Sequence, residues 1–178
     1  MFDILDLPDS TTITRIAQRY PMLEIPAFET WLSLMRVSGD CMADLDQFLA
    51  RYNLSQRKFF VLILLMRNPN GLKVSQLAEG TGVSCATMTG VVDGLLNAGL
   101  ITREADPQDR RAFVVEITET GQTLLDQLLP RHYQRLSGIM ALLDATERMQ
   151  LQALLGKVRA GLESVRTANN VLCQEDSL

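Results

Sequence analysis

The sequence predicts a mainly α-helical fold with a small antiparallel sheet of two or three strands. Three observations support this prediction. Apolar residues recur at spacings of three, four and seven through most of the chain, which is the period of an amphipathic helix. Two short helical segments are joined by a turn that contains Gly82. Directly after Gly99 the apolar period changes from 3.6 to two, which predicts paired strands.

Residues 1–26 form an expected N-terminal extension with a short helix over Thr11–Tyr20. Pro26 suits the first turn of the next helix, because that turn does not use the N–H that proline lacks. In the next segment, residues 27–54, apolar residues at helical spacing over Phe28–Tyr52 predict one long amphipathic helix. Such a helix is about 37 Å long, too long for one small core to cover. We therefore expect a second chain to cover part of it.

Residues 55–117 predict three short helices followed by a β-hairpin with a long polar tip. Serine is a frequent N-cap because its hydroxyl accepts a backbone N–H of the first turn, and Ser55, Ser75 and Ser84 each precede a helical segment. The last two helices form the helix-turn-helix pattern. The expected elements are helices over 56–67, 76–80 and 85–98 and strands over 100–104 and 113–117.

Residues 118–167 predict C-terminal helices that pair with a second chain. We expect the first to kink at Pro130, since proline cannot donate the backbone hydrogen bond of that turn, and to continue to about residue 143. Asp144 and Glu147 form a capping box that opens the last helix. Its apolar residues repeat like a coiled-coil seam, which is typical of a dimerisation helix. Residues 168–178 are polar and predict a flexible tail.

The composition limits the class of protein. The chain has 178 residues, of which 47% are hydrophobic and 21% are charged, as in an ordinary soluble globular protein. The longest apolar run, Phe59–Met66, is well short of the ~20 residues that cross a bilayer. The amino terminus carries Asp3, Asp6 and Asp9 instead of the basic start of a secretory signal. We therefore expect no membrane contact and a cytoplasmic location.

The reactive residue types give no sign of a catalytic or metal site. Cys41, Cys85 and Cys173 lie far apart, and His132 has neither an acidic cluster nor a zinc-binding spacing around it. The sequence also has no phosphate-binding glycine loop, dinucleotide fingerprint or nucleophile elbow. It therefore predicts no metal, no cofactor and no enzyme activity.

Charge is distributed unevenly along the chain. Residues 1–50 hold 3 basic and 8 acidic side chains, residues 51–111 hold 8 and 5, and residues 112–178 hold 6 and 8, which gives net charges of −5, +3 and −2. The middle third is thus the basic part. A basic segment in an acidic chain indicates a surface that binds a polyanion.

The most specific motif lies in the expected hairpin. Residues 106–111 read Asp-Pro-Gln-Asp-Arg-Arg, and residues 114–121 read Val-Val-Glu-Ile-Thr-Glu-Thr-Gly. With these strings, the order of elements resembles the multiple-antibiotic-resistance regulator (MarR) family of winged-helix transcription regulators. Further matches are Leu77-Ala78, Gly82-Val83-Ser84, Val92-Asp93-Gly94-Leu95 and Gly99-Leu100-Ile101, so the resemblance covers residues 28 to about 165.

The resemblance implies a winged helix-turn-helix over residues 55–117 and a homodimer whose N- and C-terminal helices interlock. In this family the second helix of the helix-turn-helix enters a major groove of double-stranded DNA, and the wing tip reaches an adjacent minor groove. The implied function is a sequence-specific transcription repressor that binds a pseudo-palindromic operator. The resemblance also implies release by a small aromatic or phenolic acid.

Four charged residues of the hairpin are DNA-binding candidates. An arginine at a narrow, exposed tip can enter the minor groove, which is about 6 Å wide and attracts a guanidinium by its negative potential. We assign this role to Arg110. The carboxylate of Asp109 can hold that guanidinium in a fixed orientation. Arg111 and Arg103 are better suited to phosphates.

The expected recognition helix has no arginine or lysine on its exposed face, so it lacks the usual arginine readout of guanine. Base contacts then depend on the hydroxyls of Thr87 and Thr89, although each can instead bond to the local backbone. Ala86 can meet a thymine methyl group, and Gly90 allows close approach of the backbone. The phosphate candidates are Ser84, through N–H groups at the helix start, and Arg57 and Lys58 of the preceding long helix.

A small-molecule site between the long helices and the winged domain is a further expectation. Trp31, Met35 and Phe60 are candidates for its apolar wall, and Arg36 is the candidate partner of a carboxylate. Aromatic and methionine residues at helical spacing also fit a plain core face, so both interpretations stand at this point.

Two alternatives for the function remain open. The uncharged recognition helix also fits a protein-interaction module that has kept the winged fold without sequence-specific DNA binding. A thiol switch through Cys41 or Cys85 can take the place of a ligand, because the dipole at a helix N-terminus favours the thiolate of Cys85.

Overall fold

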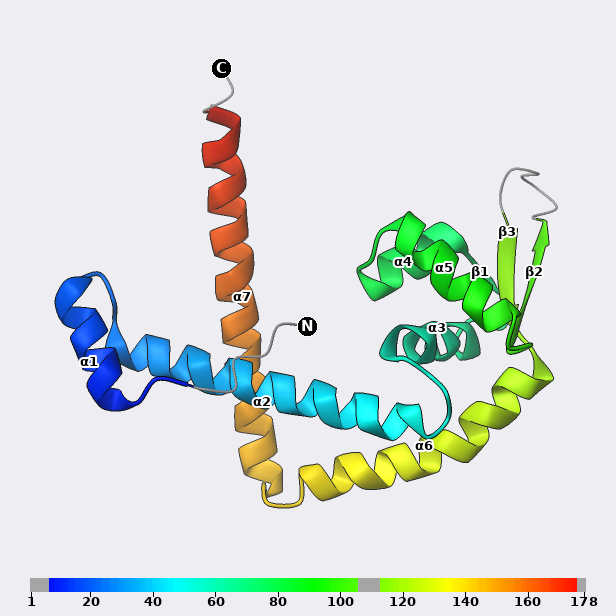
Figure 1. The fold of residues 1–178 in the computed structure, drawn as a ribbon, viewed down its shortest axis with the longest axis horizontal. Helices are drawn as coiled ribbons and strands as arrows, with labels where there is room; N and C mark the ends of the chain where they lie inside the picture. The colour runs from blue at the N-terminus through cyan, green and yellow to red at the C-terminus, as the bar shows by residue number, and fades with distance from the viewer. Residues whose placement is uncertain (1–6, 106–112, 176–178) are drawn as a thin grey trace. The chain divides into compact units, whose positions relative to one another are not determined.

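The computed structural model describes residues 7–105 and 113–175, with side chains as far as residue 168. Within these ranges the chain is mostly helical and has one three-stranded antiparallel sheet (Figure 1). The predicted fold class is thereby confirmed. The elements are α1 Ser10–Arg19, α2 Ile25–Ala50, α3 Gln56–Met66, β1 Leu72–Lys73, α4 Val74–Thr81, α5 Cys85–Leu96, β2 Ile101–Ala105, β3 Phe113–Ile117, α6 Glu119–Ile139 and α7 Ala145–Glu175.

The chain divides into two units, Met1–Leu128 and Leu129–Leu178, and the division falls inside α6. The first unit contains α1 to α5, the sheet and the first half of α6. The second contains the rest of α6 and α7. No helix of the described ranges is both long and apolar enough to cross a membrane.

The sheet joins the predicted hairpin to a short third strand. β2 pairs with β3 from Ile101 opposite Ile117 to Ala105 opposite Phe113, and β1 pairs with the other edge of β3. The order is therefore β1-β3-β2. This pairing fixes the hairpin beside the helix-turn-helix, because β1 leads directly into α4.

The core of the first unit forms where α3, α4, α5 and the sheet meet. The apolar run predicted to be deeply buried lies in α3, where Val61 and Leu62 have no exposed surface. Each surrounding element contributes at least one fully or almost fully buried apolar side chain, which removes the packed face from water. These are Leu49 of α2, Leu77 of α4, Met88, Val92 and Leu95 of α5, Val115 of β3, and Leu125 and Leu128 of α6.

Most of the predicted helix starts are confirmed by their capping bonds. The Ser84 hydroxyl accepts the Thr87 N–H at 3.2 Å, and the Thr118 hydroxyl accepts the Gly121 N–H at 3.0 Å. The capping box at the start of α7 has both expected bonds, from the Asp144 N–H to the Glu147 carboxylate at 2.8 Å and from the Glu147 N–H to the Asp144 carboxylate at 2.9 Å. The Ser55 side chain caps α3 by accepting the Lys58 N–H.

The N-cap predicted at Ser75 is wrong. α4 begins at Val74, two residues before the expected start at residue 76, and Lys73 takes the N-cap position. The Gln76 side chain accepts the Lys73 N–H at 2.8 Å. The physical reason is the third strand: Lys73 is held extended by its pairing with Val114, so the helix starts as soon as the strand ends.

The long helices differ from their predicted bounds. α2 begins at Ile25 and has Pro26 in its first turn, as proline prefers. α6 is continuous across Pro130 and ends at Ile139, before the expected residue 143, where turn bonds replace the helical ones. α7 continues to Glu175. The prediction of a flexible tail from residue 168 is therefore wrong for residues 168–175, which are helical. No glycine or proline follows Gly161 to stop the helix.

Candidate nucleic-acid interface

Helix α5 is the second helix of the helix-turn-helix and presents one whole face to solvent. Its inner face buries Met88, Val92 and Leu95, which pack against α3, α4 and β2. Gly82 makes the turn before it with a φ of 66°, a conformation that glycine adopts without strain. All of the DNA-contact residues predicted on this helix and at its cap are exposed, namely Ser84, Ala86, Thr87, Thr89 and Gly90.

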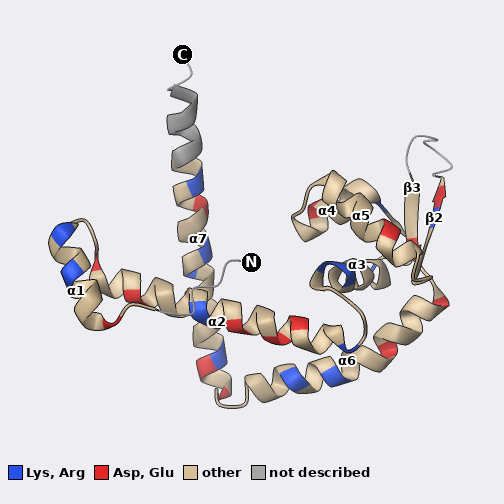
Figure 2. Ribbon diagram, in the orientation of Figure 1, with Lys and Arg blue, Asp and Glu red and all other residues tan. Residues whose placement is uncertain are grey.

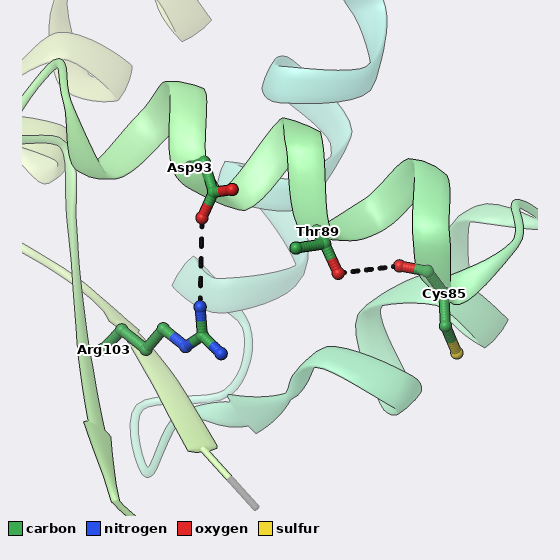
Figure 3. A network of polar contacts seen from close by, with 4 residues as sticks. All are labelled: Cys85, Thr89, Asp93 and Arg103. Carbon is green, nitrogen blue, oxygen red and sulfur yellow. Dashed lines mark hydrogen bonds and ion pairs between the residues drawn. The ribbon is translucent and has the colours of Figure 1, made fainter.

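The hydroxyls that were predicted to read bases are engaged locally. The Thr89 hydroxyl donates to the Cys85 carbonyl oxygen at 3.0 Å (Figure 3). The hydroxyls of Thr87 and Ser84 lie 2.9 Å apart and share one hydrogen bond. Because the Thr89 hydrogen is donated to the backbone, that oxygen remains available to a base only as an acceptor.

Arg103 of β2 is held against α5 instead of standing free. Its Nη1 lies 3.9 Å from Oδ1 of Asp93 (Figure 3). Its guanidinium carbon lies 4.1 Å from the centroid of the Phe113 ring. Its Nε is buried and has no hydrogen-bond partner among the described residues. The residue predicted to contact phosphate therefore connects the wing to the recognition helix in the free chain.

Sequence reasoning did not assign roles to Asp93 and Phe113, the partners of Arg103. The available signal was an acidic residue on the outer face of a helix otherwise suited to DNA. An unpaired carboxylate there repels phosphates, so a cation from a neighbouring element is needed beside it.

The two cations of α3 lie in its first turn and differ in exposure. Arg57 is exposed, whereas Lys58 is half-buried and lies against α5. A Cβ at Gly94 would come within 3.2 Å of the Lys58 Nζ, so glycine at that position makes room for the lysine. Figure 2 shows basic residues on α3 and none on α5. The positive charge beside the recognition helix thus comes from its neighbours.

Comparison with known proteins adds an independent observation. A family model described as the MarR family matches residues 54–113. The repressor YetL of Bacillus subtilis is 30% identical to this chain over 155 residues, which covers 86% of the chain and 93% of YetL. The chain belongs to the MarR family. This family consists of transcription regulators, so the resemblance stated from the sequence is confirmed.

Solved structures of MarR proteins share the fold. The S. aureus MepR–DNA complex superposes with a TM-score of 0.67 at 22% identity and covers 74% of this chain and 96% of that one. CouR from Rhodococcus jostii RHA1, bound to p-coumaroyl-CoA, superposes with a TM-score of 0.61 at 27% identity and covers 70% and 87%. The winged helix-turn-helix with long flanking helices is therefore the MarR fold.

The wing-tip residues predicted to contact DNA or to orient such a contact, Asp109, Arg110 and Arg111, lie outside the described residues. The two strands that flank them, ending at Ala105 and beginning at Phe113, are paired with each other. The roles given to the three charged residues remain predictions.

The four residues predicted to form a ligand pocket do not line the hollow found on α2 and α3. Trp31, Met35 and Phe60 are 43%, 52% and 41% exposed, and Arg36 is half-buried. A hollow of about 330 Å³ lies instead between α2 and the start of α3. It is lined by Gly39, Met42, Ala43, Asp46, Ser55, Gln56 and Arg57.

The hollow continues the face on which Trp31 and Met35 lie. Gly39 and Met42 follow Met35 by four and seven residues, which places them on the same side of α2. The Gln56 side chain donates to the Met42 carbonyl oxygen at 2.9 Å and so ties α3 to α2 at this point. In the part of the chain that the structure describes, no group of three His, Cys, Asp or Glu side chains is placed to hold a metal ion.

Proposed function

We propose that this chain is a homodimeric, sequence-specific DNA-binding repressor that a small aromatic or phenolic acid releases from its operator. The observation that carries the proposal is α5, which is capped at Ser84, packed on three neighbouring elements and exposed along its whole outer face. A helix held in this way can enter a major groove, which accommodates an α-helix. Such a regulator acts where the chromosome is, so we assign it to the cytoplasm.

A second copy of the chain is the occupant that the C-terminal helices fit. Every described side chain of α7 is exposed, including six apolar residues at coiled-coil spacing. A continuous apolar face of this size marks an interaction surface. The six residues and their exposed fractions are Leu151 38%, Leu154 57%, Leu155 43%, Val158 37%, Leu162 41% and Val165 60%.

In the dimer, two α5 helices would read two half-sites related by two-fold symmetry. Their centres are expected about one helical turn, or ~10 base pairs, apart. We assign phosphate contacts to Arg57, Lys58 and the N–H groups at Ser84, and the minor-groove contact to Arg110. Arg103 reaches phosphate only if its ion pair with Asp93 opens, so its first role is to orient the wing.

Release by an aromatic acid is the second part of the proposal. Trp31, Met35 and Phe60 offer exposed apolar surface and Arg36 a cation, while the hollow further along α2 offers volume. The relative CouR supports this choice, because p-coumaroyl-CoA carries a phenol ring. A ligand lowers operator affinity only if it binds better to the DNA-free form, and DNA must then weaken ligand binding by the same factor.

The DNA-binding part is tested by recovery of bound DNA across the genome, followed by mobility shift with the recovered sites and excess competitor. A palindromic site bound in the presence of competitor is the expected result. The competing function, a protein-interaction module, is favoured by the absence of Lys and Arg from α5. If competitor DNA removes the protein from every recovered site, the binding is not sequence-specific. That result would support the protein-interaction module and contradict a repressor.

The ligand part is tested with salicylate-like and phenolic acids. We expect an active acid to lower operator affinity and to change the emission of Trp31, the one tryptophan. Cys41 and Cys85 are exposed free thiols, so an oxidative switch is the competing mechanism. If no acid acts, while peroxide abolishes binding in wild type but not in Cys41→Ser or Cys85→Ser, the thiol mechanism replaces the ligand.

A further inference from the structure

Gly90 lies in the interior of α5, where neither the backbone conformation nor a neighbouring group requires glycine. It is exposed, its φ is not among the positive ones, and a Cβ built on it meets nothing within 4 Å. Glycine stabilises a helix interior less than alanine does, because it loses more backbone freedom on folding. Glycine at this position therefore weakens α5 and improves no contact of the described chain.

For every other glycine between residues 55 and 128, the backbone conformation or a close neighbour within the chain requires glycine. Three have the positive φ that glycine tolerates best. Three more lie in helices, where a Cβ would press on a neighbouring group at 3.0 Å or less. The first three are Gly71, Gly82 and Gly99, and the second three are Gly80, Gly94 and Gly121.

Open helical glycines also occur on the helices assigned to the dimer. A Cβ added to Gly138 of α6, or to Gly156 or Gly161 of α7, would likewise meet nothing within 4 Å, and these helices are expected to meet a second copy. Gly161 follows Leu154 by seven residues and so lies beside the apolar face where a second copy is expected, whereas Gly156 lies on the other side of α7. At Gly90 the molecule expected is DNA.

The surroundings of Gly90 restrict what it can read. It is two residues from both Met88 and Val92, so it lies about 200° around the helix from each of these buried side chains. Its exposed neighbours Ala86 and Thr89 are short, and the Thr89 hydroxyl hydrogen is already donated to the backbone. The side chains of α5 itself include no long donor, and such a face can still recognise the thymine methyl group by apolar contact.

We propose that Gly90 is a specificity-determining residue whose α-carbon packs against the 5-methyl group of a thymine in each operator half-site. The inference rests on the proposed DNA-binding function. A side chain at position 90 would occupy the volume of that methyl group. Gly90→Ala in the protein and thymine to uracil in the DNA are therefore complementary changes.

The test uses the full-length protein and an operator obtained by in vitro selection with wild type. We expect Gly90→Ala to bind this operator about tenfold or more weakly. Affinity should return to nearly the wild-type value when deoxyuridine replaces one thymine per half-site. Gly90→Ala should also raise the midpoint of thermal unfolding of the protein by about 2–4 °C, because alanine favours the helix. Gln127→Ala is the control, because it places alanine at an exposed position of α6, outside the recognition helix.

Equal binding of wild type and Gly90→Ala to the selected operator would overturn the proposal. A loss of affinity that no deoxyuridine position relieves would overturn it as well. If wild type selects no operator, the proposed function itself fails, so the two failures are distinguishable.

Discussion

Helices α3 and α7 both carry apolar faces, but α3 buries its face within the chain and α7 does not. Val61 and Leu62 of α3 are fully buried, whereas Leu154 of α7 is 57% exposed. Apolar area removed from water stabilises a fold by about 25 cal/mol per Å². The winged-helix part therefore obtains its stability from its own residues, and α7 can obtain it from a second copy. Two predictions test this difference directly, and three smaller ones concern the DNA side, the Arg103 contacts and the α1 cap.

The largest effect is expected from charges on the exposed α7 face. Leu154→Glu with Leu162→Glu would bury unpaired carboxylates in a dimer, at a cost of about several kcal/mol for each ion. Light scattering should give wild type a mass near twice 19.9 kDa and the variant a mass near 19.9 kDa. Leu142→Glu, at an exposed leucine outside α7, is the control. A wild-type monomer at micromolar concentration would contradict the dimer.

Core truncation should affect α3 in a different way. Leu62→Ala leaves a cavity and is expected to lower the free energy of unfolding by about 2–5 kcal/mol, measured in urea. Leu154→Ala removes the same atoms from the exposed face and should instead raise the dimer dissociation constant. The comparison of the two helices is wrong if Leu154→Ala leaves that constant unchanged.

Changes on the DNA side should leave the dimer intact. Arg110→Ala is expected to cost about 1–3 kcal/mol of operator binding and to reduce the preference for a narrow minor groove. Lys58→Ala should weaken binding to all DNA sequences more evenly. It should also reduce the slope of the logarithm of the binding constant against the logarithm of salt concentration by about 1. Wild-type affinity of Arg110→Ala would refute the wing assignment.

The Arg103 contacts predict a smaller effect on stability. Asp93→Asn removes one partly exposed ion pair and should cost no more than about 1 kcal/mol. Arg103→Ala also loses the Phe113 ring and should cost more, by about 0.5–1 kcal/mol. Both are measured by urea unfolding without DNA. If Arg103 serves only to contact phosphate, neither substitution will change the stability of the free protein.

The smallest effect concerns the N-cap of α1. Hydrogen bonds from the side chain and backbone N–H of Thr12 hold the pKa of the Asp9 carboxyl below its ordinary value of 3.8. Because the folded pKa is the lower one, the cap contributes fully above the ordinary value and is lost as pH falls through the folded one. The protection of the α1 amides, corrected for the intrinsic exchange rate at each pH, should therefore decrease on acidification in wild type. Asp9→Asn, which keeps an accepting oxygen, should remove most of this pH dependence.

Features that depend on neighbouring residues were predictable from the sequence. The caps at Ser55, Ser84 and Asp144 were found because a cap is a hydrogen bond over three residues. The hairpin was found because the apolar period changes at Gly99. The MarR motif then placed these elements in order, and the neutral face of α5 was already visible in the residue types.

Features that depend on contacts between distant residues were decided only by the tertiary structure. Pairing of Lys73 with Val114 moved the start of α4, and Asp93 and Phe113 hold Arg103, which the sequence assigned to phosphate. The hollow lies further along α2 than Trp31 and Met35.

Gly90 shows the division most clearly. The sequence by itself determined that a glycine stands in the middle of the recognition helix. Only the folded chain decided that no neighbour fills the space beside it, because that depends on where every other element packs.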